Sequence, residues 1–238
     1  MSFVKKIFSV FLVGILFVSL PYSALAKPAK KVIDYVALGD SLAAGQTPYR
    51  EMGSGYADYL VDRFEQSQYT VGFTNFGVSG YTSMDLRNDV LTKEIVQQQL
   101  KEAEFITIDI GANDLLIALR NPASIPAAFA NLGMNLEMIL KTIDSLNPNA
   151  KVYVMGYYNP FPYYPDDQQA ELLPLLDILN QTIAERAYAN GDTFVPTAKI
   201  IEKHYEAYLP NPTDIHLSKE GYQIIAKEFW KVIDKSKN

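Results

Sequence analysis

Two stretches far apart in the sequence hold residue types that suit nucleophilic catalysis. The string GDSL (39–42) directly follows an apolar run and places Ser41 at the end of a predicted strand. A serine nucleophile needs a general base, and one of the chain's two histidines, His216, lies in a predicted loop two residues after Asp214. Residues two apart in an extended segment point to the same side, so Asp214 can accept a hydrogen bond from the imidazole and fix its tautomer. Ser41, His216 and Asp214 are therefore candidates for acyl-transfer chemistry.

The GDSL string alone also fits an ordinary strand-to-helix turn. Gly39 permits a tight exit from a strand, and Asp40 is of a residue type that is common at helix N-caps. We expect Ser41 in the first turn of the following helix, where unpaired N–H groups and the positive end of the helix dipole favour a developing alkoxide. The string by itself does not separate a capped turn from a catalytic one.

Two further segments, 75–83 (NFGVSGYTS) and 108–116 (IDIGANDLL), contain candidates for stabilising an oxyanion. The glycines of the first segment either mark turn geometry or let a backbone N–H approach a ligand closely. Asn113 in the second segment either caps a helix or donates its side-chain amide to a substrate oxyanion. The other histidine, His204, lies in an amphipathic, charge-rich stretch and is expected on a solvated helix face.

The predicted secondary structure brings these segments to one edge of a sheet. Apolar runs typical of strands alternate with stretches of helical spacing, and this alternation predicts an α/β fold whose parallel sheet is covered on both faces. The predicted strands are 32–38, 69–78, 104–111, 151–157 and 193–197, and the predicted helices are 56–66, 93–103, 127–146, 168–190 and 218–233. Ligands bind such sheets at the carboxyl ends of the strands. The positions to inspect directly follow Leu38, Phe76, Ile110, Tyr157 and Thr197.

Taken together, the four segments resemble the GDSL or SGNH hydrolases, a family of serine esterases and lipases. Ser41 in GDSL matches the nucleophile, Gly80 in VSGYTS the glycine, Asn113 in GAND the asparagine, and His216 in DIHLSKEGY the general base. The resemblance spans residues 31 to 230, and four segments in the family's order are far more specific than any one of them. It implies a flavodoxin-like three-layer α/β/α sandwich with a mainly parallel sheet. It also implies an oxyanion hole made by the backbone N–H groups of Ser41 and Gly80 and the amide of Asn113.

One position departs from the family's pattern. The family's last segment usually has its acid three residues before the histidine, where this chain has Thr213. Asp214, two residues before His216, is the nearest acid and our candidate for orienting the base. A backbone carbonyl is the alternative partner of the imidazole.

The pattern of the first 26 residues is typical of a signal for export. Lys5 and Lys6 precede an apolar run (7–20) that is shorter than the ~20 residues needed to span a bilayer, and a small-x-small motif ends at Ala26. We expect residues 1–26 to be a signal peptide cleaved after Ala26. Residues 27–238 then form a single hydrolase domain that is secreted or held at the cell surface and has no stable membrane span. An uncleaved membrane anchor is the alternative.

Charge and composition limit the expected partners. The chain carries a formal net charge of −6, and residues 1–26 hold two lysines and no acid, so the remainder is more acidic still. Nucleic acids and anionic lipids reward clustered Lys and Arg, and we expect neither as a partner. Two histidines, no cysteine and no Asp-rich calcium loop argue against a catalytic metal. Acyl transfer by a serine requires no cofactor.

The substrate is the least determined feature. The leading interpretation is an esterase or lipase acting on small-molecule or lipid esters, and the alternative is a carbohydrate O-acetylesterase acting on envelope or plant polysaccharide. A silent surface-binding domain is a third hypothesis, but it predicts loss of Ser41, Asn113 or His216, and all three are present. The aromatic segment 156–167 either lines a substrate pocket or packs as a proline-braced loop. Segment 46–56 is a candidate for the opposite rim.

Overall fold

Five parallel strands form one sheet in the computed structural model, which describes residues 30–235. The strands are β1 (Lys31–Gly39), β2 (Tyr69–Gly77), β3 (Phe105–Asp109), β4 (Lys151–Met155) and β5 (Thr193–Val195). Their order in the sheet is β2-β1-β3-β4-β5. All five predicted strands are present, and the prediction of a parallel α/β sheet is confirmed.

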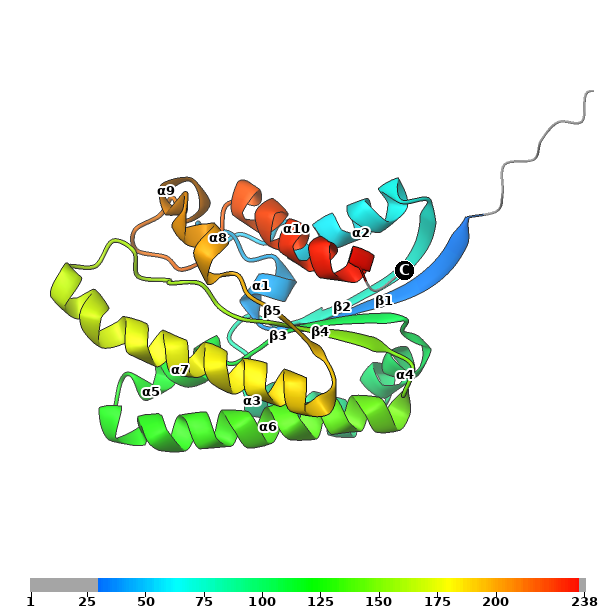
Figure 1. Ribbon diagram of the computed structural model, residues 1–238, viewed down its shortest axis with the longest axis horizontal. Coiled ribbons are helices and arrows are strands. Elements are labelled where there is room, and N and C mark those ends of the chain that lie inside the picture. The colour runs from blue at the N-terminus through cyan, green and yellow to red at the C-terminus, as the bar shows by residue number, and fades with distance from the viewer. Residues whose placement is uncertain (1–29, 236–238) are drawn as a thin grey trace, which may run out of the picture.

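Helices cover both faces of the sheet, which gives the expected three layers (Figure 1). One face carries α2 (Tyr56–Gln66), α8 (Ala198–Glu202), α9 (Tyr205–Tyr208) and α10 (Lys219–Lys235). The other carries α3 (Ser83–Thr92), α4 (Glu94–Glu102), α5 (Ala112–Ala118), α6 (Ile125–Leu146) and α7 (Asp166–Asn190). Two single-turn elements, α1 (Ser41–Ala44) and η1 (Pro122–Ser124), complete the set.

The central strand β1 shows why the sheet needs both layers. Residues 35–38 of β1 are at most 2% exposed, so side chains pointing to either face are buried, as expected for a parallel strand. On one side of the sheet, the ring of Tyr56 from α2 stacks on Phe229 from α10 with centroids 4.9 Å apart. Burying aromatic side chains of this size contributes about 1.5–3 kcal/mol each to folding.

Helix α3 was not among the predicted helices. It begins with a capping box, in which the N–H of Thr82 donates to Oδ2 of Asp85 (2.9 Å) and the N–H of Asp85 donates to Oγ1 of Thr82 (3.4 Å). The Thr-x-x-Asp spacing is a helix-start pattern that the sequence displays. The expectation for His204 was partly wrong, because it lies in the exposed turn between α8 and α9 rather than on a helix face.

The ends of the chain lie outside the described residues. The predicted signal peptide, residues 1–26, falls in this category. Between residues 30 and 235, no helix is long and apolar enough to cross a membrane.

Candidate active site

The candidate site lies at the point where the order of strand addition switches from one side of β1 to the other. After β1 the chain forms β2 on one side, and it then returns to place β3 on the other side of β1. Ligand sites of open α/β sheets form at the carboxyl ends of strands at such switch points. The GDSL turn follows β1 and Asn113 follows β3, so both lie at this position.

The GDSL turn is tightly constrained at Gly39 and Asp40. A Cβ atom on Gly39, which has φ of +157°, would lie 2.3 Å from Oδ1 of Asp109, so no larger residue fits without rearrangement. Asp40 caps α1, because its Oδ1 accepts the N–H of Leu42 at 3.0 Å. Helix α1 has only four residues, so the helix dipole adds little at Ser41, contrary to the expectation from sequence. The N–H of Ser41 nevertheless lacks an intrahelical acceptor, as does any N–H in a first turn.

Ser41, His216 and Asp214 form one hydrogen-bonded chain. Nε2 of His216 is 2.8 Å from Oγ of Ser41, and the two residues are 175 positions apart in the sequence. Nδ1 of the same ring is 2.6 Å from Oδ1 of Asp214. A ring that donates Nδ1–H to the carboxylate leaves Nε2 free to accept the serine hydroxyl proton. The imidazole contacts the side chain of Asp214 and not a backbone carbonyl, which was the alternative partner.

Gln46 is a further neighbour of the imidazole that the sequence did not single out. Its Nε2 lies 3.4 Å from Nδ1 of His216. Its backbone carbonyl accepts the hydroxyl of Tyr222 from α10 at 2.6 Å, which fixes the segment after α1. Segment 46–56 therefore reaches the base through Gln46, but none of its residues lines the cavity described below.

Asn113 and Gly80 differ in their hydrogen bonds. Asn113 is the second residue of α5 and does not cap it, since the N-cap is Gly111. Its Nδ2 donates to the carbonyl of Tyr81 at 2.8 Å, and the second Nδ2 hydrogen is available to a ligand. Gly80, directly before Tyr81, has φ of +84° and is exposed, and its N–H makes no hydrogen bond to the residues described. That Ser41, Gly80 and Asn113 bind one oxyanion stays a prediction.

Two buried carboxyl groups, those of Asp40 and Asp109, stabilise the GDSL turn by accepting its N–H groups. Asp109, the last residue of β3, accepts the N–H groups of Asp40 and Ala43 at 3.3 and 3.2 Å and the hydroxyl of Tyr56 at 2.5 Å. Asp40 accepts the hydroxyl of Tyr157 at 2.7 Å. Burial raises the pKa of both acids, and the charge of Asp40 raises the pKa of Asp109 further. The isolated sequence segments did not predict this buried pair of acids.

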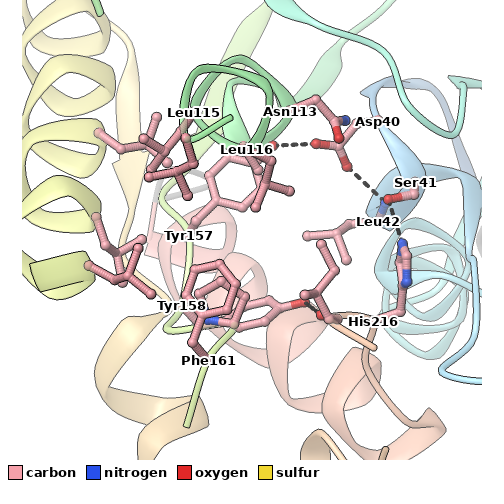
Figure 2. A pocket seen from close by; sticks show the side chains of 17 residues that line it. Asp40, Ser41, Leu42, Asn113, Leu115, Leu116, Tyr157, Tyr158, Phe161 and His216 are labelled. Carbon is pink, nitrogen blue, oxygen red and sulfur yellow. Dashed lines mark hydrogen bonds between the residues drawn. The ribbon is translucent and has the colours of Figure 1, made fainter. Parts of the chain in front are cut away.

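An apolar cavity opens beside the Ser41–His216 pair (Figure 2). Its empty volume, including the mouth, is about 610 Å³. The aromatic segment 156–167 contributes Tyr157, Tyr158, Pro160 and Phe161 to the lining. Its later part packs instead, because the hydroxyl of Tyr163 donates to the carbonyl of Leu209 at 2.8 Å. The first half of the segment therefore lines the cavity, and the second half packs against the domain.

Between residues 30 and 235, no three His, Cys, Asp or Glu side chains are grouped so that they could hold a metal ion.

The fold is thus a parallel sheet between two helical layers, with the hydrogen-bonded chain of Ser41, His216 and Asp214 at its switch point. Residues 37–224 match the GDSL-like Lipase/Acylhydrolase family, and the chain belongs to that family. A protein of Bacillus subtilis (strain 168), the uncharacterized protein YpmR, is 28% identical over 87% of this chain and 83% of its own length.

Solved structures share the fold at low sequence identity. The lipase Lip_vut3 from a goat rumen metagenome has a TM-score of 0.72 and 22% identity, over 84% of this chain and 96% of its own. A catalytic mutant of an acetylxylan esterase from Geobacillus stearothermophilus has a TM-score of 0.65 and 18% identity, over 84% of this chain and 93% of its own. The fold is therefore common to enzymes with different substrates, and membership of the family supports an esterase-type hydrolase.

Proposed function

We propose that this protein hydrolyses carboxylic esters through an acyl-enzyme formed on Ser41. The observation that carries the proposal is the continuous chain from Oγ of Ser41 through the ring of His216 to Asp214, with links of 2.8 and 2.6 Å. Membership of the GDSL-like family supports it. The apolar cavity beside Ser41 supplies space for an ester.

The geometry suits two successive acyl transfers. In the first, Oγ of Ser41 attacks the ester carbonyl while Nε2 of His216 takes the hydroxyl proton and then gives it to the departing alcohol. In the second, His216 takes a proton from water, the resulting hydroxide attacks the acyl-enzyme, and the proton returns to Oγ as the carboxylic acid leaves. Asp214 holds the ring tautomer and stabilises the transient imidazolium. The Ser41 and Gly80 N–H groups and the Asn113 amide would stabilise the oxyanion of each step.

Substitution of the nucleophile tests the proposal. Ser41→Ala should lower kcat for p-nitrophenyl butyrate by about 10⁴–10⁶, because no other hydroxyl is bonded to Nε2 of His216 among the described residues. Ser145→Ala, which removes an exposed hydroxyl bonded only to its own helix, is the matched control and should keep wild-type kcat. Undiminished hydrolysis by Ser41→Ala would refute the assignment.

We also propose that the protein is exported and processed after Ala26. The leader pattern of residues 1–26 is the support for this proposal. Small-molecule or lipid esters outside the cytoplasm are then the available substrates.

A further inference from the structure

We infer that the cavity beside Ser41 binds the acyl chain of the ester, and that the substrates are esters of apolar acyl groups longer than acetyl, of the length of butyryl to octanoyl. This inference rests on the proposed function. It selects between the two substrate classes that the sequence left open, because an O-acetylesterase needs room for only one methyl group beyond the carbonyl.

The polar lining residues Asp40, Ser41, Asn113 and His216 belong to or adjoin the catalytic turn, and the rest of the cavity wall is aliphatic or aromatic. Six leucines line it, from α5 and its C-cap and from α7: Leu115, Leu116, Leu119, Leu172, Leu176 and Leu179. Figure 2 shows Ser41 and His216 on one side of the cavity and Leu115 on the other, with the ring of Tyr157 between them. A chain attached to Oγ of Ser41 can therefore extend away from the catalytic pair into an aliphatic environment.

The tyrosines of the lining do not supply polar groups to the cavity. The hydroxyl of Tyr157 donates to Oδ2 of Asp40 at 2.7 Å, and the hydroxyl of Tyr158 donates to the carbonyl of Ile215 at 2.8 Å. The two residues are 5% and 4% exposed, and both line the cavity. A sugar ring placed here would lose hydrogen bonds to water without regaining them, at a cost of about 1–3 kcal/mol for each unpaired hydroxyl.

The extent of the aliphatic wall fits the same conclusion. Its leucines span residues 115–119 and 172–179, which is more surface than the single methyl group of an acetyl ester could cover. Each methylene buried in such a site raises kcat/KM by about three- to fourfold. The length of acyl chain that the cavity accepts can thus be measured by comparing kcat/KM for esters that share a leaving group and differ in their acyl chain.

The test compares p-nitrophenyl acetate, butyrate and octanoate as substrates of the full chain. Wild type should have kcat/KM at least tenfold higher for octanoate than for acetate. Leu172→Trp puts a bulky ring into the cavity and should lower the octanoate-to-acetate ratio at least tenfold. Leu173→Trp is the matched control, since Leu173 is the next residue of α7, is 37% exposed and lies outside the lining, and its ratio should equal that of wild type. Leu116→Trp, from α5, gives an independent readout if Leu172→Trp does not fold.

The outcomes separate this inference from the proposed function. A wild type that prefers acetate, with equal ratios in Leu172→Trp and Leu173→Trp, overturns the acyl-chain assignment and leaves the esterase intact. Release of acetate from acetylated xylan faster than hydrolysis of the octanoate would do the same. Absence of Ser41-dependent hydrolysis of all three esters would instead overturn the proposed function itself.

Discussion

Asp214 holds His216 through a short turn rather than through a long loop. Its Oδ1 accepts the backbone N–H of His216 at 2.9 Å and is also 2.6 Å from Nδ1 of the ring. An Asx-type turn of this kind positions a carboxylate over the residue two places later. The acid two places before the base therefore reaches it without the family's usual spacing of three, and Thr213 takes no part in the contact.

Removal of the Asn113 side chain should lower turnover by about 10²–10³, with KM changing far less, because an oxyanion donor acts mainly in the transition state. Steady-state kinetics of Asn113→Ala on p-nitrophenyl butyrate give both quantities. The amide also donates to the carbonyl of Tyr81, so thermal unfolding of the variant should be measured beside its kinetics.

Asn147→Ala is the matched control for Asn113. Asn147 also donates its amide to backbone carbonyls, those of Leu100 and Ala103 at 3.0 and 2.8 Å, but it lies outside the cavity lining. Its loss should change stability while kcat stays within a few-fold of wild type. Equal losses of kcat in the two variants would mean that Asn113 acts only through the fold.

At the scale of elements, the turn between β1 and α1 is fastened to the end of β3. Asp109 accepts two N–H groups of that turn, and Asp40 caps α1 and accepts the hydroxyl of Tyr157 from the segment after β4. Three strand ends are thereby held at fixed positions around Ser41. Burial raises the pKa of Asp109, and this predicts that the stability of the arrangement depends on pH.

Asp109→Asn should flatten the pH dependence of stability. The pKa of Asp109 in the folded protein is raised well above its usual 3.8, chiefly by burial, so the unfolded chain releases this proton at lower pH than the folded chain does. The group therefore stabilises the fold fully below pH 3.8, and this contribution declines as the pH rises toward the raised pKa. Urea unfolding of wild type and Asp109→Asn across that range should show the variant gaining relative stability as pH increases. Parallel curves would contradict a raised pKa of Asp109 in the folded protein.

The presence of the strands and long helices was easier to predict than their end residues or the short helices. The strand runs are apolar and bounded by polar segments, so all five were predictable. Helix α3 was missed because its apolar spacing is weak and only its capping box marks the start. The turn that holds His204 resembled a helix because two short helices, α8 and α9, flank it.

At the scale of the whole molecule, the contact between Ser41 and His216 was predictable only by combining the secondary-structure pattern, the geometry of a parallel sheet and the family resemblance. Alternating strands and helices imply a parallel sheet, a parallel sheet puts strand ends at one edge, and the family resemblance assigns the residues there. The cavity was not predictable in the same way. Its walls combine leucines of α5 and α7 with residues after β4, and no short segment of sequence shows that these side chains face a common space.

Export predicts a specific mature N-terminus. Protein recovered from the culture medium should begin at Lys27, as N-terminal sequencing or intact mass would show, because the small-x-small motif ends at Ala26. Ala24→Arg, which disrupts that motif, should leave the leader attached and the protein associated with cells. A wild-type chain that retains Met1 in the membrane fraction would favour the anchor instead.

The most direct test of the account is covalent labelling of the nucleophile. A fluorophosphonate reacts with a serine whose hydroxyl is activated by an adjacent base, and peptide mass spectrometry locates the adduct. We predict a single adduct on Ser41 in the wild-type protein and a strongly reduced rate of labelling in His216→Ala, while His204→Ala labels as wild type. An adduct on another residue, or labelling of Ser41 that does not depend on His216, would contradict the proposed catalytic chain.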